Sequence, residues 1–265
     1  FDTLKSFGID MDRVIHTPIT DVEQLKFDIT NQLNDLDKKD NVCIVIDSIG
    51  NLASKKEVDD ALDGKSVADM SRAKQMKSLF RIVTPHLNLK DIPLICVNHT
   101  YKEIGLFPKD IVSGGTGAYY SADAIWIIGR RQEKEGTEIK GYHFVVNIEK
   151  SRHVREKSQI PITVTFDGGI MKWSGLLEVA EKAGYVHKPK VGWYEALNPE
   201  TGEVLSDKMM RAKEIVDNKD FWLMMFEKTN LAKHIEKVYT IASSAGLISD
   251  DSQIEIADEE IVAND

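Results

Sequence analysis

The chain has 265 residues and a formal net charge of −9 at pH 7. Hydrophobic residues make up 42% of it, which is enough to fill a core and excludes general disorder. The net acidity excludes a protein that binds nucleic acid through overall basic charge, so such binding would depend on local basic patches. The apolar runs are too short to span a membrane.

Both cysteines of the chain, Cys43 and Cys96, lie within apolar runs. Two cysteines cannot form a disulfide scaffold, and their apolar surroundings predict buried, unreactive thiols. This cysteine usage is typical of a protein from a reducing compartment, so we expect a cytoplasmic location.

The first part of the chain predicts helices that alternate with buried strands. Thr20 and Glu23 have the spacing of a capping box, and apolar residues recur at helical intervals around them: Val22, Leu25, Ile29, Leu33 and Leu36. A second helix is predicted over about 66–83, with an apolar side formed by Val67, Met70, Ala73, Met76, Leu79, Phe80 and Val83. Apolar runs without alternation at 42–47, 94–98 and 124–128 are typical of strands buried on both faces of a parallel sheet. We therefore expect an α/β fold with a mostly parallel core sheet flanked by helices.

The pattern changes after residue 129. Strands at 142–149 and 161–166 are predicted to form an antiparallel extension, and helices are predicted around 175–183 and 220–243. We expect a core domain of residues 1–171, a small mixed lobe of residues 172–248 and an acidic tail of residues 249–265. Residues 247–265 carry seven carboxylates and no Lys or Arg. Such a tail is either a solvated segment or an acidic mimic that competes with phosphate for a basic groove.

Polar residues follow two of the predicted parallel strands. Asp47 and Ser48 come after the first strand, and Asn98, His99 and Thr100 come at the end of the second. Ligands bind open α/β sheets at the carboxyl ends of the strands, and a carboxylate there can hold the magnesium shell of a nucleotide. The alternative is that Asp47 and His99 only cap the ends of buried strands.

Two long connections, 54–65 and 101–113, leave the same edge of the predicted sheet. The first enters a helix with a single acid, Asp69, and five cations: Lys65, Arg72, Lys74, Lys77 and Arg81. The second enters a Gly-Gly-Thr-Gly segment at 114–117, where glycines that open a helix leave backbone N–H groups free to face an anion. A third basic cluster lies at 150–157 and is either a solvated turn or a further anion site. Long connections in compact domains are usually functional or disordered.

Taken in order, these segments resemble the RecA family of recombinases, and most closely its UvsX-type phage branch. The matching segments are IVIDSIGNLASKKE (44–57), KSVADMSRAKQMKSLFRIVTP (65–85), IPLICVNHT (92–100), SGGTGAYYSAD (113–123), NIEKSR (147–152) and FDGGI (166–170). The resemblance covers about residues 2–226 and is looser in the last forty residues.

The resemblance implies roles for individual residues. Asp47 would be the Walker B carboxylate that holds Mg²⁺ and, with Ser48, contacts ATP. His99 would occupy the nucleotide-sensing strand end, where cellular members usually carry Gln, and Tyr120 would lie at a subunit contact. Lys150 and Arg152 would reach the nucleotide of the neighbouring subunit, which completes the catalytic set of Asp47, His99, Lys150 and Arg152. The two connections would be DNA-binding loops, and the expected DNA-binding residues are Lys65, Ser71, Arg72, Phe107, Lys109, Gly114, Gly115 and Thr116.

The implied function is an ATP-dependent recombinase that forms a helical filament on single-stranded DNA and exchanges strands with homologous duplex DNA. Its implied partners include mediator and single-strand-binding proteins, and a phage-encoded protein would act in the cytoplasm of the host. These residues contain no GxxxxGK[ST] phosphate loop, and the strand-end Glu that activates water in the family is also missing. We expect both to lie upstream of Phe1, and we expect this chain alone to be inactive.

Two other functions are compatible with the same residues. One is the motor domain of a ring helicase, which shares the core sheet, although the 113–117 segment and Lys150 with Arg152 favour a recombinase. The other is a DNA-binding or assembly half without catalysis, which acts beside a separate nucleotide-binding half. The missing phosphate loop favours this last function for the chain taken alone.

Overall fold

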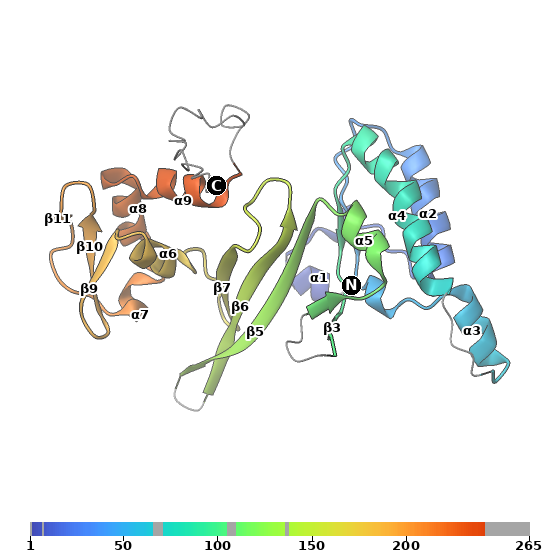
Figure 1. The fold of residues 1–265 in the computed structure, drawn as a ribbon, viewed down its shortest axis with the longest axis horizontal. Coiled ribbons are helices and arrows are strands. Elements are labelled where there is room, and N and C mark those ends of the chain that lie inside the picture. Colours follow the sequence, from blue (N-terminus) through green and yellow to red (C-terminus); the bar gives the residue numbers. More distant parts are fainter. Residues whose placement is uncertain (1, 7, 66–70, 105–109, 136–137, 242–265) are drawn as a thin grey trace, which may run out of the picture. The chain divides into compact units, whose positions relative to one another are not determined.

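A computed structural model describes residues 2–6, 8–65, 71–104, 110–135 and 138–241. The chain divides into two compact units, Phe1–Ala122 and Asp123–Asp265, and each is described by itself (Figure 1). Helices occur together with parallel and antiparallel strands, which confirms the mixed α/β class. None of the helices in the described part has the length and apolar content of a membrane span.

The first unit is built around one parallel pair of strands. Ile44 lies opposite Leu94 and Ile46 opposite Cys96, so the first two apolar runs pair as predicted. In chain order its elements are α1 (Asp2–Ser6), η1 (Met11–Arg13), α2 (Val22–Asp35), β1 (Ile44–Ile46), η2 (Ile49–Asn51), α3 (Lys55–Leu62), α4 (Ser71–Lys90), β2 (Leu94–Cys96), β3 (Thr100–Lys102), β4 (Asp110–Val112) and α5 (Thr116–Ser121).

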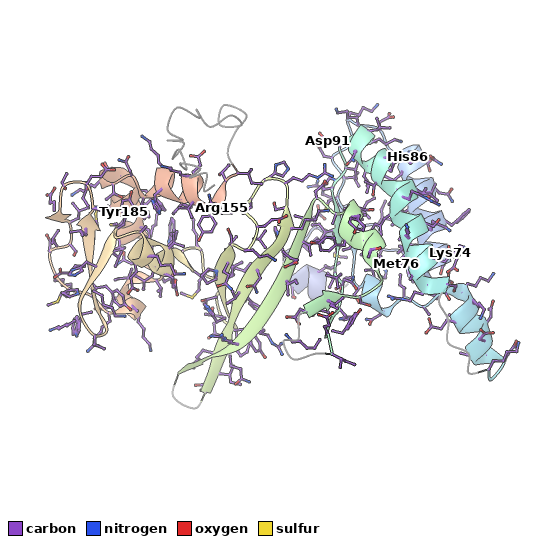
Figure 2. The ribbon with its side chains drawn as sticks, in the orientation of Figure 1. Lys74, Met76, His86, Asp91, Arg155 and Tyr185 are labelled. Atoms are coloured by element: carbon purple, nitrogen blue, oxygen red, sulfur yellow. The ribbon has the colours of Figure 1, made fainter. Side chains whose placement is uncertain are left out.

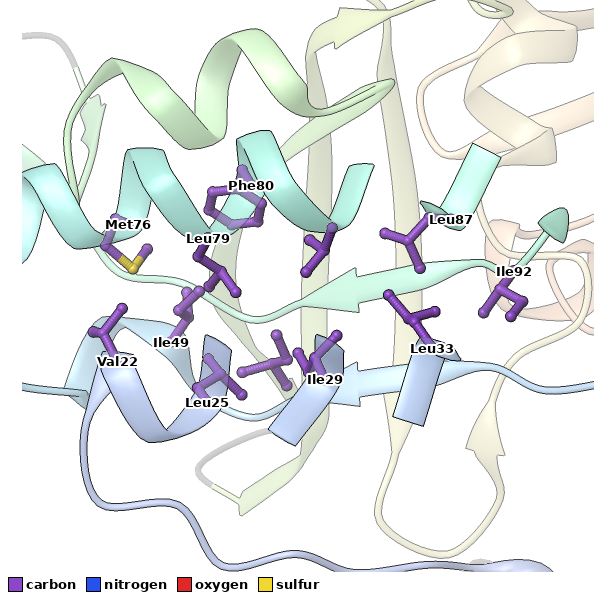
Figure 3. Packing of buried hydrophobic residues seen from close by; sticks show 12 residues of the cluster. Val22, Leu25, Ile29, Leu33, Ile49, Met76, Leu79, Phe80, Leu87 and Ile92 are labelled. Atoms are coloured by element: carbon purple, nitrogen blue, oxygen red, sulfur yellow. The ribbon is translucent and has the colours of Figure 1, made fainter. Parts of the chain in front are cut away.

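Helices α2 and α4 lie side by side and pack their apolar sides onto one face of this strand pair (Figure 3). Most of their predicted apolar positions are confirmed, since Val22, Leu25, Ile29, Leu33, Met76, Leu79, Phe80 and Val83 are all buried. Leu36 is half-buried, Ala73 is exposed contrary to the prediction, and Val67 and Met70 lie outside the described residues. Full burial of one such side chain stabilises the fold by about 1.5–3 kcal/mol. The other face of the pair differs from the prediction of two covered faces, because Val45 is 61% and Ile95 54% exposed. Among the described residues, α2 and α4 cover only one face of the strand pair.

The start of α2 and the end of α4 both differ from the prediction. The first turn of α2 is capped one residue later than predicted, because the Asp21 side chain accepts from Gln24 N at 2.8 Å while Gln24 Oε1 accepts from Thr20 N at 3.0 Å. Helix α4 runs on to Lys90 and contains Pro85. A proline removes one helical hydrogen bond. Burial of Leu87, one turn after Val83, continues the apolar side past it and favours the longer helix.

The two long connections contain regular structure that the sequence reading missed. Helix α3 lies inside 54–65 and is capped by Ser54, whose Oγ accepts from Glu57 N at 3.1 Å. In the second connection β3 and β4 pair antiparallel, with Tyr101 opposite Ile111. Residues 105–109 between them lie outside the described part.

The second unit begins with an antiparallel sheet in the order β5 (Ala124–Glu135), β6 (Glu138–Ser151), β7 (Gln159–Thr165) and β8 (Gly169–Ile170). The predicted antiparallel pairing of 142–149 with 161–166 is confirmed, since Phe144 lies opposite Ile162. The third apolar run is not a parallel strand, because it pairs antiparallel with β6 and places Ile128 opposite Val146. Only two residues separate β5 from β6, and so short a connection permits antiparallel pairing alone.

The rest of the described second unit packs around Trp222, which is fully buried and donates from Nε1 to Ile215 O at 3.0 Å. The predicted helix at 220–243 is two helices, because Thr229 caps the first and its Oγ1 donates to Met225 O at 2.5 Å. The elements are α6 (Leu176–Lys182), β9 (Val186–Lys190), β10 (Trp193–Asn198), β11 (Glu203–Val204), α7 (Ala212–Ile215), α8 (Lys219–Lys228) and α9 (Leu231–Tyr239). The boundary near residue 172 stays a prediction, and the acidic tail lies outside the described residues.

The two thiols differ from each other. Cys96 is partly buried in β2, and burial raises the pKa of its thiol to about 11. Cys43 is exposed, contrary to the prediction, because it precedes the first paired residue of β1.

Candidate functional site

The carboxyl ends of β1 and β2 bring the predicted polar residues together. Pairing continues past both strands, because Val97 N donates to Ile46 O and Ile49 N donates to Val97 O, each at 2.9 Å. Asp47 and His99 therefore lie at the same edge of the strand pair, and both are exposed.

His99 is held by a neighbour that the sequence reading missed. Its Nε2 lies 2.9 Å from Asn51 Oδ1, and its backbone N donates to Asn98 Oδ1 at 2.9 Å. A Cβ atom on Gly50 would lie 2.4 Å from His99 Cδ2, so only glycine permits this close approach. Asn98 Nδ2 donates to Ser113 O at 2.8 Å, which ties the edge to the segment before α5.

Asp47 and Ser48 offer oxygen ligands at this edge. No described side chain pairs with the Asp47 carboxylate, and Ser48 Oγ is buried without a hydrogen-bond partner in the described part of the chain. No group of three or more His, Cys, Asp or Glu residues that could hold a metal ion exists among the described residues. Magnesium usually keeps several waters and is bound by one or two carboxylates together with phosphate oxygens. One exposed carboxylate beside an unpaired hydroxyl fits that kind of ion.

Arg72 lies at this edge but is turned toward the protein. Its Nε donates to Leu52 O at 2.6 Å, and its Nη2 donates to Ile49 O and Gly50 O at 3.1 Å. A guanidinium carries five N–H donors in a planar fork, so this side chain holds the turn after β1 in place. The described contacts of Arg72 therefore give it a structural role.

The glycine segment before α5 packs closely on α4. Gly114 and Gly115 have φ angles of 90° and 79°, which favour glycine, and Gly115 is the residue before the first turn of α5. A Cβ on Gly117 would lie 2.8 Å from Lys77 Cα. Thr116 is exposed at the first residue of α5.

The remaining predicted DNA-binding residues are spread more widely. Ser71 Oγ donates to Ser54 Oγ at 2.8 Å, which joins the first turn of α4 to the start of α3. Lys65 pairs with Asp63, with Nζ 2.7 Å from Oδ2. Phe107 and Lys109 lie outside the described residues.

Lys150 and Arg152 belong to the second unit. Lys150 is in β6 opposite Ile125, and Arg152 follows the end of that strand. Arg152 Nε lies 2.9 Å from Asp123 Oδ1, an ion pair that the sequence reading missed. No local sequence pattern points to Asn51 as the partner of His99 or to Asp123 as the partner of Arg152, because many residues separate the members of each pair.

Comparison with known proteins gives consistent results. Residues 173–235 match the family model described as the C-terminal domain of the bacteriophage T4 recombination and repair protein. The recombination and repair protein of Enterobacteria phage T4 is 50% identical over 243 residues, which is 91% of this chain. The resemblance to the RecA family is confirmed.

More distant relatives include bacterial RecA proteins. Protein RecA of Streptomyces coelicolor is 24% identical over 254 residues, which is 95% of this chain, and RecA of a Nocardioides species is 24% identical over 205 residues, which is 76% of it. The chain spans 62% of the length of the phage T4 protein, 63% of the Streptomyces RecA and 57% of the Nocardioides RecA.

Proposed function

We propose that this chain is the part of an ATP-dependent DNA recombinase that carries the Walker B carboxylate and the DNA-binding loops. The observation that carries the proposal is the position of Asp47 and His99 at the same edge of a parallel strand pair. The chain is also 50% identical to the T4 recombination and repair protein over the aligned residues. A nucleotide at the carboxyl ends of such strands would meet both residues.

The nucleotide roles follow from the chemistry of this edge. Asp47 would hold Mg²⁺ through its water shell, and the ion would neutralise charge on the phosphates of ATP. Ser48 would supply a further oxygen. His99, held by Asn51, would respond to whether ATP is bound. A shift of His99 would then move the segment before α5, because its neighbour Asn98 donates a hydrogen bond to Ser113 O.

The DNA-binding roles are proposed for the N-terminal turn of α4 and the glycine segment of α5. Ser71, Gly114, Gly115 and Thr116 would present backbone N–H groups to phosphates, and Thr116 would add its hydroxyl. Lys65, Phe107 and Lys109 would lie on the connections before them. Arg72 would add a phosphate contact only through Nη1, because Nε and Nη2 are engaged with carbonyl oxygens.

The assembly would be a filament on single-stranded DNA that pairs with homologous duplex DNA. Lys150 and Arg152 would face the nucleotide of a neighbouring subunit. Mediator and single-strand-binding proteins are the proposed partners, and the cytoplasm of a host cell is the proposed location. Residues 1–171 would form the RecA-like core, with the lobe of residues 172–248 attached to it.

Hydrolysis tests the proposal most directly. These residues contain no GxxxxGK[ST] segment, so the assay uses a protein that joins them to a phosphate loop. We expect hydrolysis of ATP that single-stranded DNA stimulates, and we expect Asp47→Asn to abolish turnover because the magnesium shell is weakened. The exposed Asp35→Asn serves as the matched control and should leave turnover unchanged. Full turnover by Asp47→Asn would contradict the Walker B role.

A second candidate is a DNA-binding half that acts only beside a separate nucleotide-binding chain, which the missing phosphate loop favours. We expect the 265-residue chain to show no ATP hydrolysis by itself. Steady-state hydrolysis by the purified chain would overturn that expectation. Electron micrographs of the joined protein on DNA separate the recombinase from a ring helicase, because the former gives filaments and the latter closed rings.

A further inference from the structure

The turn after β1 is held from two sides. Arg72 donates from Nε to Leu52 O at 2.6 Å and from Nη2 to Gly50 O at 3.1 Å. These are the carbonyl groups on either side of Asn51, so Arg72 fixes the backbone that carries the Asn51 side chain. From the other side, Asn51 Oδ1 lies 2.9 Å from His99 Nε2. Asn51 therefore lies between His99 at the strand edge and Arg72 near the start of α4.

The imidazole of His99 is held at two places on this turn. An amide oxygen can only accept a hydrogen bond, so the ring nitrogen that faces Asn51 Oδ1 must carry a proton. The Cδ2 edge of the ring lies so close to Gly50 that a Cβ atom there would be 2.4 Å away. A neutral imidazole has a single N–H group, so His99 gives its one side-chain donor to Asn51.

The same turn leads into the first connection, whose two ends are bonded to each other. Ser54 is fully buried, and Ser71 Oγ donates to its Oγ at 2.8 Å. Arg72 follows Ser71, and Met76, one turn further along α4, is fully buried (Figure 2). The turn, both ends of the connection and the first turn of α4 therefore form one hydrogen-bonded unit with a buried anchor.

We propose that Asn51 is a positioning residue that couples His99 to the first connection, because it holds the imidazole on the turn until a nucleotide phosphate takes over the N–H donor. This inference rests on the proposed function, which brings a phosphate to His99. A charged phosphate oxygen makes a stronger hydrogen bond than an amide oxygen, so it displaces Asn51 from Nε2. The turn that Arg72 holds then loses its other support, and the change reaches the first connection as well as the segment before α5.

The first test observes the contact itself in the 265-residue chain. The chain has seven His residues, and NMR at mildly alkaline pH detects an imidazole N–H proton whose exchange with water is slowed by a hydrogen bond. The His99 signal is assigned by its loss in His99→Ala. It should be present in the wild type and in Asn51→Asp, which keeps an acceptor oxygen, and absent from Asn51→Leu, which has a similar size but no acceptor. Rescue by Asp alone shows that the oxygen, and not the volume of the side chain, holds the ring.

The second test measures the coupling in the protein joined to a phosphate loop. Fluorescence anisotropy gives the affinity for a labelled single strand with and without a non-hydrolysable ATP analogue, and coupled sites typically change each other's affinity by about 5–150-fold. Asn51→Leu should lower the ratio of the two affinities at least about fivefold, because the turn is then released without a nucleotide. By linkage, the effect of the strand on the affinity for the analogue should fall by the same factor. Asn31→Leu, at an exposed position of α2, is the matched control and should leave the ratio unchanged.

A double-mutant cycle shows whether Asn51 acts through His99. His99→Ala should also lower the ratio, and adding Asn51→Leu to it should cause no further change, because the ring that Asn51 holds is already missing. A further fall as large as that in Asn51→Leu alone would overturn the proposal, since Asn51 would then act by another route.

The proposal is also overturned if the wild type gives no His99 proton signal, or if Asn51→Leu keeps that signal or the wild-type ratio. Failure of the proposed function is a different result. Normal Asp47-dependent hydrolysis with an unchanged ratio in Asn51→Leu contradicts only the coupling by Asn51. A joined protein that neither binds nor hydrolyses ATP contradicts the recombinase, and the His99 signal still decides whether Asn51 positions the ring.

Discussion

Arg152 and Asp123 form an ion pair at the end of β6, with Arg152 Nε 2.9 Å from Asp123 Oδ1. The backbone supports it, since Arg152 N donates to Asp123 O at 3.2 Å. Both side chains are more than half exposed, at 64% and 57%, and exposed pairs contribute only about 0–1 kcal/mol to stability. Arg152 can therefore exchange Asp123 for a phosphate at little cost. Its terminal nitrogens bond to no described residue, so they can meet an anion first.

This geometry leads to a prediction for Lys150 and Arg152. In the protein joined to a phosphate loop, Lys150→Ala or Arg152→Ala should spare ATP binding by monomers and remove DNA-stimulated hydrolysis. Cations offered across a subunit boundary contribute roughly 10³–10⁵ in rate in other nucleotide hydrolases. A steady-state assay with nucleotide binding measured in parallel checks both parts.

Mixing provides the control for that prediction. When Arg152→Ala is combined with Asp47→Asn, some interfaces pair an intact Asp47 with intact cations, so activity should return in part. If the mixture stays inactive while both variants assemble together on DNA, Arg152 does not act across the subunit boundary. Asp123→Ala should change the free energy of unfolding by less than about 1 kcal/mol.

Arg72 is predicted to matter for stability as well as for DNA. Arg72→Ala removes three hydrogen bonds to the carbonyl oxygens of residues 49, 50 and 52, and should lower the free energy of unfolding by about 2 kcal/mol. Arg72→Lys should restore only part of it, since an ammonium lacks the planar fork. Urea denaturation measures the change. An unaltered midpoint for Arg72→Ala would show that the side chain does not hold this turn.

Gly50 is predicted to be irreplaceable beside His99. A Cβ on residue 50 would lie 2.4 Å from His99 Cδ2, so Gly50→Ala should displace the imidazole from Asn51 and destabilise the protein by about 1–3 kcal/mol. Gly129→Ala is the matched control, because its nearest atom would be 3.9 Å away. Thermal denaturation of both variants compares them, and equal midpoints would contradict the close approach.

The two thiols are predicted to react at different rates. Cys96 has a pKa of about 11 because it is buried, so below that pH it stays a thiol and reacts slowly, whereas the exposed Cys43 is alkylated first. Between the ordinary pKa of 9.0 and about 11 the unfolded chain loses this proton while the folded chain keeps it, so stability falls as the pH rises through that range. Mass spectrometry after brief iodoacetamide treatment locates the modified residue. Faster labelling of Cys96 than of Cys43 at pH 8 would be inconsistent with this burial.

Periodicity alone determined the local elements that pack on the strand pair. Val22, Leu25, Ile29 and Leu33 were predicted to share a side of one helix, and they do, because apolar residues at intervals of three and four can be buried only on a helical stripe. The same reasoning found the strands at 44–46 and 94–96 and the antiparallel pairing of β6 with β7. It also placed Asp47 and His99 at strand ends.

Only the tertiary structure decided which partners those residues meet. His99 bonds to Asn51 across 48 residues, Arg72 turns to carbonyl oxygens 20–23 residues away, and the third apolar run pairs antiparallel with β6. Such contacts depend on how separate segments approach one another, and no local pattern encodes that approach. The sequence by itself therefore determined the elements and the chemistry at the strand ends. The packing of distant segments decided that Arg72 holds a turn and that Arg152 pairs with Asp123.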